Sequence, residues 1–188
     1  IPRKQAKTIN LALSYGMGKE KLIKELGLDN TEAEKLFQRY HAKVPFIRAL
    51  QDQCARVAIE RGYIKTFAGR RCRFDRWESR YERTPPLPLE EAKEKYGNDL
   101  KRSYTYKALN RLIQGSAADM TKLAMIGLWE EGIVPHLQVH DEVDISIENT
   151  EQANTVTRIM ENCVQLAVPL LVDVELGTSW GETKEVTK

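Results

Sequence analysis

The order of helix and hairpin signals is the feature that most constrains how this chain can fold. One long helical stretch stops at Gly62, and the segment "YIKTFAGRRCRF" that follows has the composition of a hairpin. A second stretch, over residues 99–131 and interrupted at Gly115, precedes "LQVHDEVDISI", in which apolar and polar residues alternate. Helices interleaved with short hairpins predict an α+β fold with a small antiparallel sheet.

The other predicted elements have local start and stop signals. The sequence predicts helices over residues 3–15, 19–26, 31–61 and 151–166, and a last strand near 170–176. Thr31 and Glu34 have the spacing of a capping box, and Pro45 disturbs the helix that they open. Residues 75–98 hold three prolines and the charged run "EEAKEK", which is typical of a surface loop or an insertion.

Charge is unevenly distributed along the 188 residues, although the net charge is only +2. Residues 1–83 hold 19 Lys and Arg against 10 Asp and Glu, and residues 84–188 hold 10 against 17. This asymmetry suits a polyanion bound at one end and a cation near the other, although ordinary solvated helices would give the same charges. The three scattered cysteines lack metal-ligand spacing, which favours core thiols in a reducing compartment.

The first predicted helix is basic and carries a regular pattern. Arg3, Lys7, Leu11 and Tyr15 follow one another at i+4 spacing, so they form one stripe on the helix surface. Two cations about 6 Å apart along the axis match the reach of a triphosphate, and the apolar residue and the tyrosine lie where a sugar and a base could follow. The alternative is an amphipathic helix with solvated charges and Tyr15 on its core side.

Three adjacent titratable residues, His140, Asp141 and Glu142, interrupt the apolar pattern of the second hairpin. We expect the tip of this hairpin at Asp141 and Glu142. Asp is common in solvated turns, so these residues by themselves leave a plain turn and a functional site both open.

Four segments together resemble family A DNA polymerases, the DNA polymerase I family. The series Arg3-x3-Lys7-x3-Leu11-x3-Tyr15-Gly16 resembles the nucleotide-binding helix of the fingers. "NRLIQGSAADMTKLAMI" is similar to the palm helix that touches the primer–template, "QVHDE" to the second catalytic carboxylate motif, and "VPLLVDVELGTSWGE" to the C-terminal end. The segments occur in the family's order at similar spacing, with residues 75–105 as the weakest part.

The resemblance implies part of a right-hand polymerase fold. Residues 1–61 would be a helical fingers segment, and residues 62–188 a palm with a small antiparallel sheet and a loop or insertion at about 75–105. The chain would be the C-terminal part of a template-directed DNA polymerase, incomplete without an upstream segment that carries the thumb and the other catalytic Asp. Leu11 stands where better-known members carry Phe or Tyr, which puts sugar discrimination in question and tilts the source toward a phage.

The resemblance also implies roles for individual residues. Asp141 would bind one of two Mg²⁺ ions, because Mg²⁺ prefers oxygen ligands. Lys7 would protonate the leaving pyrophosphate, and Glu142 would be an auxiliary acid. The implied nucleotide-binding residues are Arg3, Lys7, Leu11 and Tyr15. The implied DNA-binding residues are Asn110, Gln114, Gln138, His140 and Arg71.

These roles imply primer–template DNA, deoxynucleotides and an upstream polymerase segment as partners, in the cytoplasm of a bacterial or phage-infected cell. The sequence agrees with this location, since it contains no apolar run of membrane-spanning length and no signal-peptide pattern. One rival is a non-catalytic DNA-binding module derived from a polymerase. Another is a zinc hydrolase using His136 and His140, but residues four apart on a strand do not converge on one metal.

Overall fold

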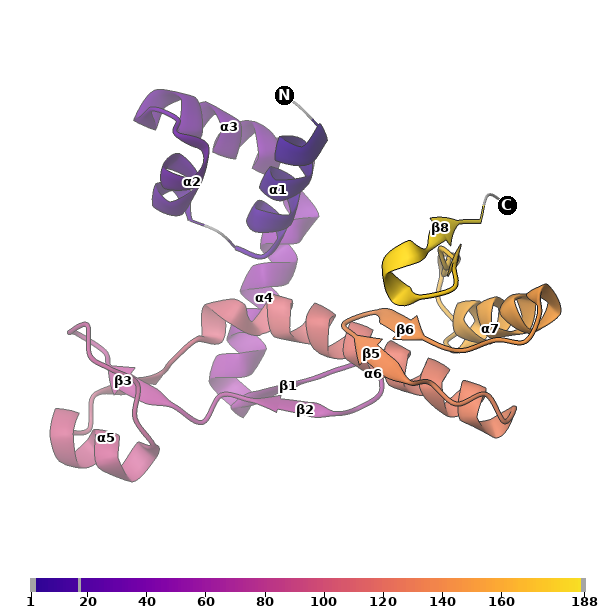
Figure 1. The fold of residues 1–188 in the computed structure, drawn as a ribbon. Coiled ribbons are helices and arrows are strands. Elements are labelled where there is room, and N and C mark those ends of the chain that lie inside the picture. Colours follow the sequence, from indigo (N-terminus) through magenta and orange to yellow (C-terminus); the bar gives the residue numbers. More distant parts are fainter. Residues whose placement is uncertain (1–2, 17, 187–188) are drawn as a thin grey trace. The chain divides into compact units, whose positions relative to one another are not determined.

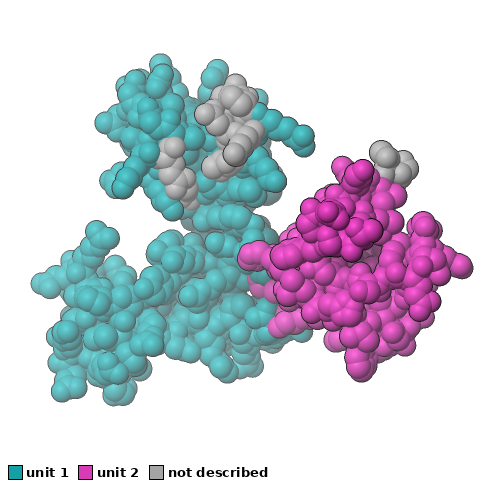
Figure 2. All heavy atoms as spheres, in the orientation of Figure 1, with its two compact units in different colours: residues 1–114 teal, residues 115–188 magenta. Residues whose placement is uncertain are grey.

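The computed structural model describes residues 3–16 and 18–186. The described residues form two compact units, which are divided between Gln114 and Gly115 and are called unit 1 and unit 2 (Figure 2). The elements of unit 1 are α1 (Arg3–Ser14), α2 (Lys19–Leu26), α3 (Asn30–Lys43), α4 (Pro45–Arg61), β1 (Tyr63–Lys65), β2 (Arg71–Arg73), β3 (Trp77–Ser79), α5 (Leu89–Tyr96), β4 (Leu100–Arg102) and the 3₁₀ turn η1 (Thr105–Lys107). Helix α6 (Ala108–Glu130) begins in unit 1 and continues in unit 2. Unit 2 also contains β5 (Leu137–Val139), β6 (Glu142–Asp144), α7 (Thr150–Asn162), β7 (Glu175–Leu176), the 3₁₀ turn η2 (Trp180–Glu182) and β8 (Lys184–Glu185).

The predicted α+β class is confirmed, but its sheets are smaller than expected. Among the described residues there are four antiparallel sheets of two strands each. They pair β1 with β2, β3 with β4, β5 with β6, and β7 with β8. The expected last strand near 170–176 is therefore reduced to Glu175–Leu176, which pairs with Lys184–Glu185.

Helices α1, α2 and α3 group together at the start of the chain (Figure 1). Their shared core consists of Ile9, Leu13 and Leu22, with half-buried side chains packed around them. Gly27 ends α2 in the left-handed conformation that a residue without Cβ adopts freely. The predicted capping box at Thr31 and Glu34 is wrong, because Asp29 is the N-cap of α3 and Glu32 completes the box.

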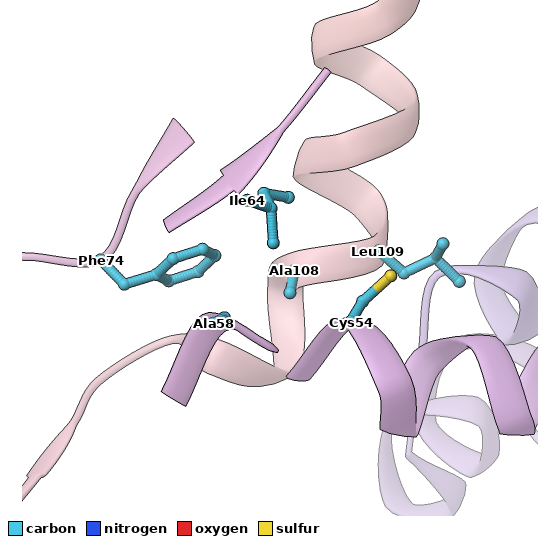
Figure 3. Packing of buried hydrophobic residues seen from close by; sticks show 6 residues of the cluster. All are labelled: Cys54, Ala58, Ile64, Phe74, Ala108 and Leu109. Carbon is cyan, nitrogen blue, oxygen red and sulfur yellow. The ribbon is translucent and has the colours of Figure 1, made fainter. Parts of the chain in front are cut away.

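Pro45 separates α3 from α4 and occupies the first position of the new helix, where its missing N–H costs nothing. Helix α4 then packs on the β1–β2 hairpin and on the start of α6 (Figure 3). The cluster in Figure 3 consists of Cys54, Ala58, Ile64, Phe74, Ala108 and Leu109. Phe74 is 2% exposed, and burial of a side chain of this size contributes about 1.5–3 kcal/mol.

The segment expected as a surface loop or an insertion contains regular secondary structure, so it is not a plain loop. Strands β3 and β4 pair with Trp77 opposite Arg102, and α5 packs against both strands. The helix expected over 99–131 therefore begins only at Ala108, since residues 100–107 form β4 and η1. Gly115 does not interrupt α6.

Two of the three cysteines confirm the expectation of core thiols most directly. Cys54 is buried and Cys163 half-buried, and burial raises the pKa of both thiols above the ordinary value. Thiols with raised pKa stay protonated near neutral pH and are poor nucleophiles. None of the helices in the described ranges is long and apolar enough to cross a bilayer.

Candidate functional site

The predicted stripe on α1 lies on the exposed side of this helix. Arg3 and Lys7 are exposed, and Leu11 is 44% exposed. Ile9 and Leu13 occupy the buried side, against α2 and α3. The packing of the apolar face thus turns the two cations and Leu11 outward, where they are accessible to a ligand.

Tyr15 follows α1 and is half-buried. Its hydroxyl accepts a hydrogen bond of 2.9 Å from the Gln114 side-chain amide. Asn110 lies one helical turn before Gln114 on α6 and is half-buried, so both amides belong to one helix face. The structure therefore brings the end of the predicted nucleotide-binding helix into contact with Gln114, and Asn110 lies one turn away on the same face of α6.

Gln51 helps to hold this end of α1 in place, and nothing in the sequence singles it out. Its side-chain amide donates to the carbonyls of Leu13 and Ser14, at 3.1 and 2.9 Å. The last carbonyls of a helix have no partner within the helix, so these bonds stabilise the C-terminus of α1. Gln51 lies on α4, which is distant in sequence, and no local pattern would have revealed the contact.

The β1–β2 hairpin is a basic surface in unit 1. Arg71, Arg73 and Lys65 are exposed, and the Arg71 guanidinium lies 4.7 Å from the centroid of the Tyr63 ring. Arg111 of α6 stacks on Phe74 at 4.5 Å and donates to the carbonyl of Arg73. Stacked guanidinium groups keep their outward N–H donors free for phosphate oxygens.

The β5–β6 hairpin presents Asp141 at its turn. Leu137 pairs with Asp144, Gln138 with Val143 and Val139 with Glu142, so the two turn residues are His140 and Asp141. The expected tip at Asp141 and Glu142 is therefore displaced by one residue, because Glu142 belongs to β6. Asp141 and Glu142 are both exposed.

The turn itself has a specific backbone geometry. His140 has φ +56°, and tight two-residue hairpin turns require a positive φ at their first central residue. The Gln138 side-chain amide donates to the His140 carbonyl, which restrains the turn. Gln138 and His140 thus fix the position of Asp141, whatever else they contact.

Asp141 fits a hard divalent cation, since its carboxylate is exposed and offers oxygen ligands. Within the described part of the chain, no three His, Cys, Asp or Glu side chains gather closely enough to hold a metal ion. One carboxylate is a partial ligand set for such a cation. The zinc alternative gains no support, because His136 is within hydrogen-bond distance of Ser146, at 3.1 Å, and joins no such group.

The comparisons with known proteins point to a single family. The family model for DNA polymerase family A matches residues 2–182. A DNA-directed DNA polymerase of Pseudomonas phage M6 is 36% identical over 217 aligned residues, which cover 97% of this chain and 30% of that protein. The thermostable DNA polymerase I of Thermus aquaticus is 36% identical over 193 residues, which cover 98% of this chain and 21% of that protein.

A solved structure agrees with the sequence comparisons. The POL domain of Pol1 from M. smegmatis, in complex with DNA primer-template and dNTP, matches with a TM-score of 0.68 and 27% identity. The match covers 89% of this chain and 28% of that one, so this chain spans less than a third of the relatives named here. Matching motifs, a shared fold and near-complete coverage by the family model agree that this chain belongs to DNA polymerase family A.

Proposed function

We propose that this chain supplies the nucleotide-binding helix and one catalytic carboxylate of a polymerase that adds deoxynucleotides to a primer 3′ end, directed by a template. The observation that carries the proposal is the exposed Asp141 at a fixed hairpin turn, in a chain whose exposed α1 stripe has triphosphate spacing. Family membership and the primer-template DNA and dNTP bound by the M. smegmatis relative support the substrates.

In unit 1, Arg3 binds phosphate oxygens through its planar fork, and Lys7 binds them as a mobile point charge. Lys7 also gives its proton to the pyrophosphate leaving group, which is a stronger base than the intact triphosphate. Leu11 faces the sugar, and Tyr15 contacts the templating base. The hydrogen bond from Gln114 restrains the Tyr15 hydroxyl and orients the ring.

DNA contacts come from both units. Asn110 and Gln114 offer amide donors and acceptors to the minor groove, where readout of sequence is weak. Arg71, which lies on the β1–β2 hairpin, binds a phosphate of the DNA backbone. Gln138 and His140 contact the primer end beside Asp141. Contacts of this kind position DNA of any sequence, as a replicating enzyme requires.

Asp141 would hold Mg²⁺, with Glu142 as an auxiliary acid. Bound Mg²⁺ supplies activation of the primer 3′-hydroxyl and neutralises charge on the phosphates. Two such ions would repel each other unless several anionic ligands surrounded them. We therefore propose that a further polymerase segment, in the same or a separate chain, provides the second Asp.

Primer extension tests this proposal. We expect no extension of a labelled primer by the 188-residue chain alone, and Mg²⁺-dependent extension once the upstream polymerase segment is added. Asp141→Ala in this pair should abolish extension and leave DNA affinity unchanged, because the carboxylate does not attract phosphate. Asp173→Ala, which removes an exposed carboxylate of unit 2 outside the hairpin, is the matched control and should extend normally.

Each unexpected outcome has a definite meaning. Extension by the chain alone would show that it contains a second metal-binding carboxylate. Full activity of the Asp141→Ala pair would remove the β5–β6 hairpin from the reaction. DNA binding without extension in any combination would favour a non-catalytic DNA-binding module.

A further inference from the structure

Tyr104, Tyr106 and Lys107 form an exposed cluster of two aromatic rings and one cation, here called the YYK cluster. The Lys107 ammonium lies 4.8 Å from the Tyr104 ring centroid and 5.7 Å from that of Tyr106. Tyr106 is 65% exposed and Tyr104 36% exposed. Aromatic rings stabilise a protein most when buried, so two rings kept at the surface around a cation need another explanation.

The backbone of the YYK cluster is strained. Tyr104 has φ +62° and ψ +12°, in the left-handed region that is costly for a residue with a Cβ. Its carbonyl accepts a hydrogen bond of 2.9 Å from the Lys107 backbone, which closes the η1 turn. This turn places both rings beside Lys107 before any ligand arrives, and strained backbone of this kind gathers at functional sites.

The YYK cluster lies beside the C-terminal end of α1 within unit 1. A methyl group placed on Gly16 would stand 4.0 Å from the Tyr106 carbonyl oxygen. The next helix, α6, starts at Ala108 directly after Lys107 and carries Gln114, which binds the Tyr15 hydroxyl. The cluster is therefore next to the residue proposed above to contact the templating base.

We propose that the YYK cluster binds the unpaired part of the template strand, by stacking bases on Tyr104 and Tyr106 and holding a neighbouring phosphate with Lys107. Every base has an aromatic face, so such stacking tolerates any sequence. Lys107 exchanges a weak contact with two rings for a stronger one with a phosphate oxygen. The inference rests on the proposed polymerase function and adds a subsite for single-stranded DNA.

The test compares two DNA ligands that differ only in single-stranded character. One is a duplex with a 5′ overhang of template, and the other is the same duplex with blunt ends. Affinities of the 188-residue chain are measured by fluorescence anisotropy, and 2-aminopurine in the overhang reports stacking directly through quenching of its fluorescence. The variants are Tyr106→Ala and Tyr104→Asn, since Asn tolerates a positive φ better than most residues.

We expect wild-type protein to bind the overhang DNA more tightly than the blunt DNA. Each variant should lose about tenfold in affinity for the overhang DNA and little for the blunt DNA, with less quenching of 2-aminopurine. Tyr106→Trp should keep the affinity because it keeps a stacking face. Tyr81→Ala is the matched control, since Tyr81 is 78% exposed and lies outside the cluster.

The outcomes separate this inference from the proposed function. Equal affinities of wild type and variants for the overhang DNA would overturn the inference and leave the polymerase assignment intact. An equal loss for both DNAs, or the same loss with Tyr81→Ala, would also overturn it. Failure of the wild type to bind either DNA would contradict both proposals.

Discussion

Leu11 is an apolar residue on the exposed face of α1, between Lys7 and Tyr15 in the stripe. With 44% of its surface exposed, it contributes little to the core formed by Ile9 and Leu13. In the role proposed above, a branched aliphatic side chain at this position would contact a ribose through its methyl groups only. It lacks the ring edge and hydroxyl with which a Tyr could sense the 3′ position of a nucleotide.

At the residue scale we therefore expect Leu11→Tyr to change the ratio of dideoxynucleotide to deoxynucleotide incorporation. Single-turnover incorporation by the chain together with its upstream segment measures this ratio. Ala6→Ser, a small change at another exposed position of α1, serves as the control. Identical ratios in wild type and Leu11→Tyr would place the residue away from the sugar.

At the residue scale, the sequence predicted where Asp141 lies, and its role stays a prediction. Asp141 stands at a hairpin turn as predicted, because alternation fixes which residues leave the strands. The displacement of the turn by one residue was not predictable, since no Gly or Asn-Gly pair marks it. The Gln114 bond to Tyr15 was equally hidden, because it joins residues 99 positions apart.

At the scale of elements, a prediction is correct where local interactions define the element and wrong where distant residues define it. Gly27 and Gly62 end their helices by a local requirement for positive φ, which sequence reveals. Trp77 pairs with Arg102, which is distant in sequence, so no local pattern predicts strands β3 and β4. The prolines before α5 are typical of loops, and the prediction therefore missed the β3–α5–β4 element. Gly115 costs α6 about 1 kcal/mol relative to Ala, which neighbouring helical turns absorb.

Gly62 provides a prediction at the scale of elements. A Cβ there would come within 2.8 Å of the Arg102 guanidinium, which stacks on Trp77 at 4.4 Å and donates to the Phe74 carbonyl at 3.0 Å. Gly62→Ala must therefore disturb the stacking and the hydrogen bond, as well as forcing Ala into a left-handed conformation.

Gly27→Ala is the matched control, because Gly27 has the same helix-ending role and nothing within 4 Å of an added Cβ. Both variants should lose about 1–2 kcal/mol of unfolding free energy from the backbone term. We expect Gly62→Ala to lose about 1–2 kcal/mol more, for the stacking and the hydrogen bond. Urea denaturation measures the difference, and equal losses would show that Arg102 adapts without cost.

At the scale of the whole molecule, charge separation is the dominant property. Residues 1–83 carry a net charge of +9 and residues 84–188 a net charge of −7. The β1–β2 hairpin concentrates part of the positive charge on exposed arginines. Binding of DNA by such a surface releases counterions, so affinity should fall steeply as salt is added.

We expect the double variant Arg71→Gln and Arg73→Gln to reduce the slope of log affinity against log salt by about two, as two phosphate contacts are lost. Lys122→Gln combined with Lys184→Gln changes the net charge equally in the acidic half and should leave the slope unchanged. Anisotropy titrations with duplex DNA at several salt concentrations measure both slopes. Equal slopes in all three proteins would exclude the hairpin from the DNA-binding surface.

The two-stranded sheets have a practical consequence for handling the protein. In the part of the chain that the structure describes, each sheet has only two strands, and β5 exposes Leu137 by 44% and Val139 by 37%. An open, apolar strand edge is a template on which another molecule can add its own strand. Slow aggregation during concentration or storage would therefore start at β5, and Val139→Lys would oppose it by placing a charge on that edge.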